Sequence, residues 1–437
     1  MKAGAILKAR EERGLAIEKL EKIYSQAVIS VTVNIPGGKK ADRDYSWIGV
    51  LAFNEIIRQL PQEGIIYEKF RETCDGPEGI IVASGKAEEL KRIAVDIEET
   101  HPLGRLFDID ISGFSRHNHG GKRACFICGG DANSCRRDGK HSIEDLMDRI
   151  DSMIGAWEAS IVESAVESVM IAMKSEVDAT PKPGLVDRDN NGAHTDMDHG
   201  TFIKSIRALK PYFREMAEVS VHCSASQHEL FSELRLIGKR AEMAMLKATD
   251  GINTHKGQIF SLGLAVGAGC CLKRKGELSP ESLSKMISSM AQGLSKTELK
   301  FKIESNTHGE KVFDTYGVTG IRGQAEKGFP AAFNVGLPAY EEAIAIGYDE
   351  NRAMLKSLLA IMECLEDSNV YIRGGPYAAT WVKKKSFELL EEDRVSEDEE
   401  LRAIREFDSD MISKNISPGG AADMLALTVF AYQFTKR

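Results

Sequence analysis

The chain has 437 residues, of which 42% are hydrophobic and 28% are charged, and its formal net charge is −9. This composition is ordinary for a soluble globular protein with an ample core, and the length predicts two or three domains. The net negative charge argues against a general nucleic-acid binder, although local basic groups can still hold anionic small molecules.

Residues 1–24 combine periodic apolar residues with lysines, arginines and glutamates, which predicts an amphipathic helix rather than a signal peptide. The longest apolar run, residues 259–272, is too short and too rich in glycine to span a bilayer. It predicts a buried helix. We therefore expect a cytoplasmic protein that has no membrane partner.

Residues 1 to about 150 mix helix and strand signals. β-Branched and apolar runs predict strands at residues 27–33, 65–67, 79–83 and 105–111. Helical periodicity predicts helices at residues 47–57 and 86–99. The N-terminal part is therefore predicted to be an α/β or α+β domain.

The pattern changes after residue 141, where Ser142 and Asp145 resemble a capping box at the start of a long helix. No flexible linker is visible, and Gly155 is the expected break, which predicts domains at residues 1–155 and 156–437. Beyond it, helical periodicity recurs at residues 201–219, 226–248, 256–273, 279–293, 339–347, 351–366, 374–390 and 420–434. The C-terminal domain is therefore predicted to be all-α.

Two aspartates, Asp108 and Asp110, lie in the apolar run that predicts a strand over residues 105–111. Because strand side chains alternate between faces, we expect Leu106 to share their face while Phe107, Ile109 and Ile111 enter the core. Neighbouring carboxylates repel unless a cation such as Mg²⁺ neutralises them. The pair is either a magnesium site for a polyphosphate or a strand end with two solvated acids; Arg105 is either a phosphate ligand or a surface charge.

Three cysteines and a histidine cluster at Cys125, Cys128, Cys135 and His141. In a cytosolic protein this pattern favours a metal or plain thiols over disulfides. Cys-x₂-Cys with a further cysteine and a histidine suits a Cys₃His zinc site. The spacing is not that of a common zinc finger, so reduced cysteines that fill a loop are the alternative.

Residues 178–198 form a long stretch that is rich in ionisable residues, and two prolines end the preceding helix. Long loops inside compact domains are commonly functional. Asp187, His194 and Asp196 are candidate metal ligands or bases, and Lys182 is a candidate phosphate ligand. A solvated loop without chemistry is the alternative.

The segment Gly-Ile-Asn-Thr-His-Lys-Gly, residues 251–257, directly precedes the apolar helix. Small and polar residues at a helix N-terminus present free N–H groups and the positive end of the helix dipole to an anion. Lys256 would suit a phosphate there, while Asn253 is either a ligand or only the N-cap. Arg322 lies in a glycine-rich segment that is predicted to be a flexible loop.

Polar, glycine-rich segments mark two further helix ends. Asp367 and Arg373 precede a Gly-Gly pair, and Gly419 and Gly420 open the last helix with Asp423 in its first turn. Each signal is weak alone. Together they predict that several helix ends of one helical domain build a polyphosphate site.

The two parts of the chain resemble the two proteins that make and attach the prosthetic group of citrate lyase, fused in one polypeptide. Residues from about 10 to 150 are similar to the phosphoribosyl-dephospho-CoA transferase that acts on the apo acyl carrier subunit, through HPLGRLFDIDI and the C-x₂-C-x₆-C-x₅-H spacing. Residues from about 158 to 435 are similar to triphosphoribosyl-dephospho-CoA synthase, through TPKPGLVDR, NGAHTDMD, GINTHKG and SPGGAAD. One departure is Gln324, where the family has an acidic residue; Glu326 is its nearest replacement.

The resemblance implies that the C-terminal domain joins ATP to 3′-dephospho-CoA and releases adenine. Attack of a ribose 2′-hydroxyl on C1 of the ATP ribose requires a base, an acid for adenine, and Mg²⁺ with basic groups on the triphosphate. Metal or base roles then fall to Asp187 and Asp196, and the acid role to His194 or His255. Candidate substrate and phosphate ligands are Lys182, Asn253, Lys256, Arg322, Arg373, Gly419 and Gly420.

For the N-terminal domain, the resemblance implies a nucleotidyltransferase-like α+β fold that moves phosphoribosyl-dephospho-CoA onto a serine of the apo acyl carrier subunit of citrate lyase and expels pyrophosphate. Asp108 and Asp110 would bind Mg²⁺, Arg105 would hold the leaving group, and the cysteine–histidine cluster would be structural. Two alternatives stay open. The N-terminal domain could be a docking module for the acyl carrier without transferase activity, or the chain could be a metal-dependent phosphohydrolase with an all-α domain.

Overall fold

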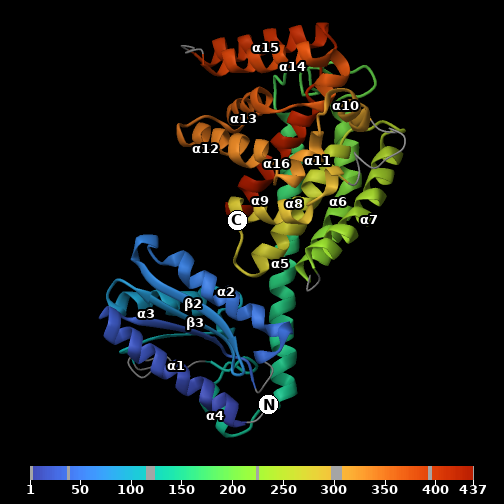
Figure 1. Cartoon of the computed structure of the whole chain (residues 1–437). Coiled ribbons are helices and arrows are strands. Elements are labelled where there is room, and N and C mark those ends of the chain that lie inside the picture. Colours follow the sequence, from blue (N-terminus) through green and yellow to red (C-terminus); the bar gives the residue numbers. More distant parts are fainter. Residues whose placement is uncertain are drawn as a thin grey trace. The chain divides into compact units, whose positions relative to one another are not determined.

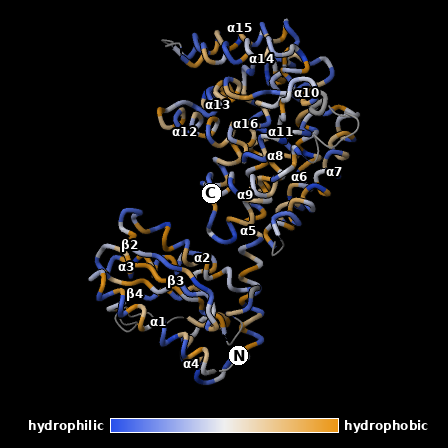
Figure 2. The backbone as a smooth tube through the Cα atoms, viewed as in Figure 1, coloured by the Kyte–Doolittle hydropathy of each residue, from blue (hydrophilic) through white to orange (hydrophobic). Residues whose placement is uncertain are grey.

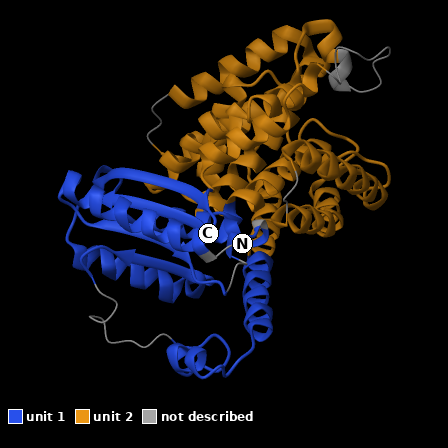
Figure 3. Ribbon diagram, turned by 60° about the horizontal axis from the view of Figure 1, so that its bottom comes forward, with its two compact units in different colours: residues 1–160, 273–277 blue, residues 161–272, 278–437 orange. Residues whose placement is uncertain are grey.

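The computed structural model describes residues 3–36, 40–114, 124–222, 226–296, 308–391 and 396–436. The chain forms two compact units (Figure 3). Unit 1 comprises residues 1–160 and 273–277, and unit 2 comprises residues 161–272 and 278–437. Within the described segments, no helix combines the length and the apolar composition needed to cross a membrane.

Helix α5 (Ile143–Asp178) begins in unit 1 and ends in unit 2. It starts with the predicted capping box, in which the Ser142 and Asp145 side chains each accept a backbone N–H from the other residue. The helix continues through Gly155, where the sequence predicts the boundary between the domains, and the two compact units divide between residues 160 and 161. A single glycine costs a helix interior only about 1 kcal/mol, which is too little to interrupt a long, packed helix.

Unit 1 contains a four-stranded antiparallel sheet with strand order β2-β3-β1-β4. The strands are β1 (Val28–Val33), β2 (Ile65–Thr73), β3 (Gly76–Ala83) and β4 (Phe107–Ile111). The helices of this unit, besides the start of α5, are α1 (Ala3–Tyr24), α2 (Arg43–Gln59), α3 (Ala87–Thr100) and α4 (Ala132–Arg137) (Figure 1). The sheet with its helices confirms the predicted fold class in its α+β form.

The alternation of strand side chains divides the core of unit 1 between the two faces of the sheet. On one face, Ile29 and Val31 join a large buried cluster that includes apolar residues of α2 and α3. On the other face, Val28 and Val82 pack against the apolar stripe of α1 around Ile17. Figure 2 shows the hydrophobic residues gathered along these strands.

Two details of the strand predictions are wrong. The strand predicted at residues 65–67 continues to Thr73, because β2 is an edge strand in which no side chain is fully buried, so the sequence gave little apolar signal. Leu106 does not share a face with the two aspartates. It lies in a short 3₁₀ helix (Gly104–Leu106) before β4 and is fully buried in the core.

Helices are the only regular secondary structure among the described residues of unit 2, which confirms the predicted all-α domain. Its helices after α5 are α6 (His199–Val221), α7 (Gln227–Ala248), α8 (Lys256–Arg274), α9 (Pro280–Met290), α10 (His308–Tyr316), α11 (Gly320–Glu326), α12 (Leu337–Ala345), α13 (Glu350–Cys364), α14 (Ser368–Glu391), α15 (Glu397–Ser413) and α16 (Gly419–Lys436), with a π-helical turn at Ala331–Gly336. Helix α11 corrects the prediction that Arg322 lies in a flexible loop.

Helices α8 and α16 form the apolar centre of unit 2, and most of their residues are buried. Glycines in α8 allow the close approach: a Cβ at Gly257 would come within 1.8 Å of the Asp423 carboxylate, and a Cβ at Gly269 within 2.8 Å of the Phe434 ring. The two contacts occur in the same order along both helices. The helices therefore run parallel, and their N-terminal ends lie together.

Candidate functional site

A cavity of about 700 Å³ opens in unit 2 beside the N-terminal ends of α8 and α16. Its lining comes from helices α5, α6, α7, α8, α11, α14 and α16, and from the loops before α6, α8, α14 and α16. This volume lies within the range of about 300–1,000 Å³ that is typical of ligand sites. Two helix N-termini that meet at a cavity present partial positive charge to an anion.

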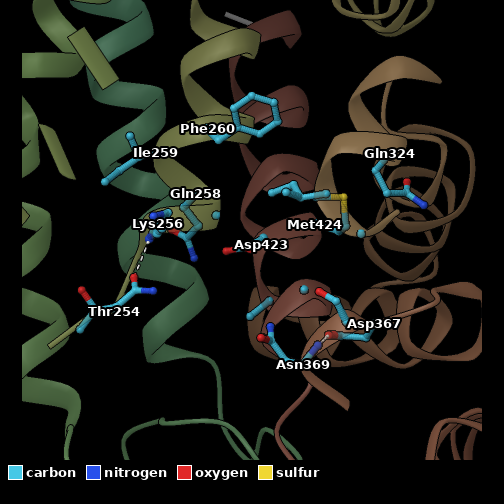
Figure 4. Close-up of a pocket in the computed structure, with 18 of the residues that line it drawn as sticks. Thr254, Lys256, Gln258, Ile259, Phe260, Gln324, Asp367, Asn369, Asp423 and Met424 are labelled. Carbon is cyan, nitrogen blue, oxygen red and sulfur yellow. Dashed lines mark hydrogen bonds between the residues drawn. The ribbon is translucent and has the colours of Figure 1, made fainter. Parts of the chain in front are cut away.

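Two aspartates, Asp423 and Asp367, lie at the meeting point of these helix ends. Asp423 projects from the first turns of α16 towards the start of α8, as Figure 4 shows. Asp367 precedes α14 and accepts backbone N–H groups of Asn369 at 2.8 Å and of Ala421 at 2.9 Å, so it caps two helices. Both side chains line the cavity.

The surroundings of the two carboxyls give them unusual proton affinities. Burial, reinforced by the nearby charges of Asp367 and Glu176, raises the pKa of Asp423 well above its usual range. Burial also raises the pKa of Asp367 to about 6, against the backbone hydrogen bonds that stabilise its charged form. Asp423 therefore keeps its proton to a higher pH than an ordinary aspartate, while Asp367 is mostly ionised near pH 7.

A buried ion pair forms the floor of the cavity. The Lys182 amine lies 2.5 Å from Oε1 of Glu176, and both side chains are about 2% exposed. The other Glu176 oxygen accepts a hydrogen bond from the Gln258 amide at 3.2 Å, and Oε1 of Gln258 has no partner among the described residues. Lys182 thus lines the cavity as predicted, but its charge is already neutralised by a residue that the sequence analysis did not select.

Further cations stand on the walls of the cavity. Lys256 lines it and lies 2.5 Å from Glu242 of α7, while Asn253 accepts the Lys256 backbone N–H at 3.2 Å and so serves as an N-cap. Arg322 of α11 also lines the cavity. Lys239 of α7 lines it as well, and no ion pair to its amine occurs within the described segments.

A histidine in the loop before α6 faces the same cavity. Nε2 of His194 lies 2.9 Å from Oγ of Ser417, and its Nδ1 lies 3.3 Å from a guanidinium nitrogen of Arg373. Burial, followed by the charge of Arg373, lowers the pKa of His194, so the ring is neutral near pH 7. Asp196 lies 3.8 Å from this ring, but its side chain is 61% exposed and it is absent from the cavity lining.

The structure gives Asp187 a different position from the predicted one. The carboxylate accepts four hydrogen bonds from its own loop: from the Thr180 hydroxyl and from the backbone N–H groups of Lys182, Asp189 and Asn190, at 2.8–2.9 Å. Because these bonds occupy both oxygens and the residue does not line the cavity, Asp187 shapes the loop rather than presenting a free metal ligand or base.

His255 also lies outside the cavity lining. The ring is fully buried, its Nδ1 lies 2.7 Å from the Ser205 hydroxyl, and Phe202 stacks edge-on against it. Burial, with a smaller effect of the Lys182 charge, lowers the pKa of His255 to about 3. A ring that is neutral, buried and outside the cavity lining cannot be the predicted acid.

The position of the family's missing acidic residue is occupied by Gln324, which lines the cavity. Glu326 does not replace it, because its carboxylate accepts the backbone N–H of Ser295 at 2.9 Å and is not part of the lining. Gly419 and Gly420 do line the cavity, at the start of α16. A Cβ at Gly420 would lie 3.0 Å from the Asp367 carboxylate, which explains the need for glycine there.

In unit 1, Asp108 and Asp110 project from the same face of β4, while Phe107, Ile109 and Ile111 are buried. The Thr32 hydroxyl of the neighbouring strand donates to Asp108 at 3.2 Å. The predicted strand and the shared face of the two aspartates are confirmed. Two half-buried carboxylates on one face provide the hard oxygen donors that Mg²⁺ prefers.

Arg105 lies immediately before β4 and contacts the cysteine-rich segment. Its guanidinium donates to the backbone oxygen of Ala124 and lies 5.6 Å from the ring centre of Phe126. These two contacts hold Arg105 near the start of β4, where the sequence predicts that it contacts a phosphate.

The four predicted metal ligands do come together. The donor atoms of Cys125, Cys128, Cys135 and His141 all lie within 4.8 Å of one another. Hydrogen bonds, first from His141 and then from the backbone of Gly130, lower the pKa of the Cys128 thiol to about 6. None of these cysteines forms a disulfide.

Comparison with known proteins relates both units to characterised families. A family model for ATP:dephospho-CoA triphosphoribosyl transferase (CitG) matches residues 162–437, and one for apo-citrate lyase phosphoribosyl-dephospho-CoA transferase (CitX) matches residues 1–157. The protein CitXG of Haemophilus influenzae is 34% identical over 450 residues, which cover 98% of this chain and 96% of that protein. The protein CitXG of Leuconostoc mesenteroides subsp. cremoris is 34% identical over 448 residues, covering 97% and 95%.

A third relative matches the second half alone. The 2-(5''-triphosphoribosyl)-3'-dephosphocoenzyme-A synthase of Pectobacterium atrosepticum is 40% identical over 270 residues, which cover 61% of this chain and 88% of that protein. Both matched families are transferases. The predicted resemblance is thereby confirmed: the chain belongs to the CitXG family, in which a CitX and a CitG transferase are fused.

Proposed function

We propose that this chain makes the prosthetic group of citrate lyase and attaches it. Residues 156–437 join ATP to 3′-dephospho-CoA, with release of adenine. Residues 1–155 then transfer the phosphoribosyl-dephospho-CoA group to a serine of the apo acyl carrier subunit, with release of pyrophosphate. We expect both reactions to occur in the cytoplasm, where ATP is supplied.

The observation that carries the first activity is the pairing, in one cavity beside two helix N-termini, of a fully buried aspartate whose pKa is raised with several basic side chains. Departure of a purine base requires a proton, and a triphosphate requires positive charge. Asp423 supplies the proton, while Lys239, Lys256 and Arg322 supply the charge. Magnesium enters as part of the substrate, MgATP.

The bond changes follow from these positions. The 2′-oxygen of dephospho-CoA forms a bond to C1 of the ATP ribose as the bond from C1 to the adenine nitrogen breaks. Asp423 donates its proton to the leaving adenine, and Nδ1 of the neutral His194 ring, once released from Arg373, accepts the proton of the attacking hydroxyl. The product is 2′-(5″-triphosphoribosyl)-3′-dephospho-CoA, and the net proton count is unchanged.

Four catalytic assignments made from the sequence change in this mechanism. Asp187 has no direct metal or base role, because hydrogen bonds from its own loop occupy both carboxylate oxygens. Asp196 has none because it does not line the cavity. His255 gives up the acid role to Asp423. His194 is retained, but as the base.

The second activity is supported by β4 and by Arg105. The carrier serine oxygen attacks the phosphorus next to the ribose, and the bond from that phosphorus to pyrophosphate breaks. Asp108 and Asp110 would hold a Mg²⁺ that neutralises the phosphates when bound, and Arg105 would contact the departing pyrophosphate. Water can accept the proton of the serine hydroxyl. A protein base is not required, because positioning and charge neutralisation dominate phosphoryl transfer.

The experiment separates the two steps in the full-length chain. With MgATP and dephospho-CoA we expect one adenine released per dephospho-CoA consumed, with no phosphate release, which distinguishes the synthase from a phosphohydrolase. Added apo carrier should then gain the mass of the prosthetic group. If preformed triphosphoribosyl-dephospho-CoA does not modify the carrier, the N-terminal half is only a docking module.

A further inference from the structure

The segment between β4 and α5 carries a cysteine cluster whose geometry matches metal coordination. Zinc with ligand bonds of about 2.3 Å in a tetrahedron separates two sulfur ligands by about 3.8 Å. Sγ of Cys128 lies 3.5 Å from Sγ of Cys135, and the other two donors lie within 4.8 Å. The separation is too long for a disulfide, which requires about 2.05 Å.

The backbone around Cys125 and Cys128 forms a tight turn that points both sulfurs at one place. The Cys125 N–H donates to Gly130 at 2.6 Å, and the Gly129 N–H donates back to the Cys125 oxygen at 3.1 Å. Gly129 adopts a φ of 70°, which side chains disfavour. The turn holds the Cys128 thiol at the surface, where it is exposed. An exposed thiol does not fill the interior of a loop, so packing alone does not account for this arrangement.

The remaining two ligands come from separate elements that converge on the turn. Asp131 accepts the backbone N–H of Ser134 at 3.2 Å and so starts α4, which carries Cys135. The Lys140 N–H then donates to the Cys135 oxygen at 3.0 Å and brings His141 back to the cluster. Nε2 of His141 is buried without a hydrogen-bond partner among the described residues.

We infer that Cys125, Cys128, Cys135 and His141 bind one zinc ion, and that this ion positions Arg105 for the transfer reaction. Three sulfurs and one imidazole select Zn²⁺ over the hard cations Mg²⁺ and Ca²⁺. With all four positions filled by protein, the site is structural rather than catalytic. The second part of the inference rests on the proposed transferase function; the first part does not.

The link to Arg105 runs through residues adjacent to the ligands. Ala124, whose backbone oxygen accepts a hydrogen bond from the Arg105 guanidinium, directly precedes Cys125. Phe126, whose ring faces the same guanidinium, directly follows it. A metal that fixes Cys125 therefore fixes both groups that hold Arg105, while loss of the metal frees them.

The metal is tested on the purified full-length chain, without any activity assay. We expect about one zinc per chain by elemental mass spectrometry, and tetrahedral thiolate–Co²⁺ absorption after exchange with cobalt. Cys135→Ser should lose both signals. Cys74→Ser is the matched control in unit 1, since its thiol donates to the Ala5 oxygen as a hydroxyl would, and it should keep them. Zinc-free wild-type protein that gives no cobalt spectrum, or Cys135→Ser that retains zinc, would overturn the site.

The positioning role is tested by non-additivity. If zinc acts on transfer through Arg105, chelation should slow carrier modification in the wild type and leave an Arg105→Gln chain no slower than before. If the two losses multiply, the zinc is only a structural clip and the positioning role is wrong. Zinc content is unaffected by either kinetic result, so failure of the transferase assignment and failure of the metal site remain distinguishable.

Discussion

The two units hold their key carboxylates in opposite environments. On β4, Asp108 and Asp110 lie half-exposed on one face of a strand. In the cavity of unit 2, Asp423 and Asp367 are enclosed by helix ends, and burial raises the pKa of both. The difference corresponds to the two reactions. Phosphoryl transfer needs charged oxygens for a metal, whereas release of adenine needs a carboxyl that still carries its proton.

The largest effect should come from removing the proton donor. Asp423→Asn keeps the size of the side chain but cannot act as an acid, and loss of acid catalysis costs about 10²–10⁴-fold in rate. We expect adenine release from MgATP and dephospho-CoA to fall by this factor, measured by chromatography. Carrier modification from preformed intermediate should be unchanged. Native rates of adenine release would remove Asp423 from the mechanism.

The converse change should separate the units in the other direction. Asp108→Asn weakens metal binding on β4, and loss of one such electrostatic contact costs about 10²–10³-fold. Carrier modification should fall by that amount while adenine release continues at its normal rate. A variant with full transfer activity over a range of Mg²⁺ concentrations would show that β4 holds no catalytic metal.

A glycine pair tests the position of Asp423. A Cβ at Gly257 would collide with the carboxylate at 1.8 Å, so Gly257→Ala should displace Asp423. A displacement of about 1 Å can cost 10²-fold. Gly238→Ala is the control, because Gly238 also lines the cavity from a helix and its added Cβ would meet nothing closer than 3.8 Å. Equal activities of the two variants would contradict the proposed contact.

The pH dependence should be milder and should differ between the units. The pKa of Asp423 is raised, so this residue keeps its proton to a higher pH than an ordinary aspartate and loses it as the pH rises through the raised value. The pKa of His194 is lowered, so the base stays neutral at and somewhat below pH 6.5. Adenine release should therefore decline on the alkaline side as Asp423 ionises, and on the acid side once the pH falls below the lowered pKa of His194, in each case by up to about tenfold per pH unit. Transfer from preformed intermediate should lack this alkaline decline.

How much the sequence could predict also differs between the units. The candidates in unit 1 lie between residues 105 and 141, and alternation along β4 and the cysteine spacing locate most of their geometry directly. The buried Leu106 was missed because β4 starts at Phe107, two residues later than the predicted strand. Because these residues are close together in the sequence, their spacing leaves few alternative arrangements of the site.

The site in unit 2 joins residues from distant helices, and spacing cannot rank them. Asp187 and Asp423 look alike in sequence, but only the structure distinguishes a carboxylate saturated by its own loop from one enclosed in a cavity. Glu176 gave no signal, because an acid near the end of a long helix is usually exposed. Its importance comes from Lys182, which tertiary packing brings to 2.5 Å.

The division of labour between the units is tested most directly by mixing the two variants. Asp423→Asn and Asp108→Asn chains are incubated separately and together with MgATP, dephospho-CoA and apo carrier, and the carrier mass is measured. We predict no modification by either variant alone and modification by the mixture, because the Asp108→Asn chain makes the intermediate that the Asp423→Asn chain transfers. Modification by one variant alone, or none by the mixture of folded chains, would contradict two separate active sites with these residues.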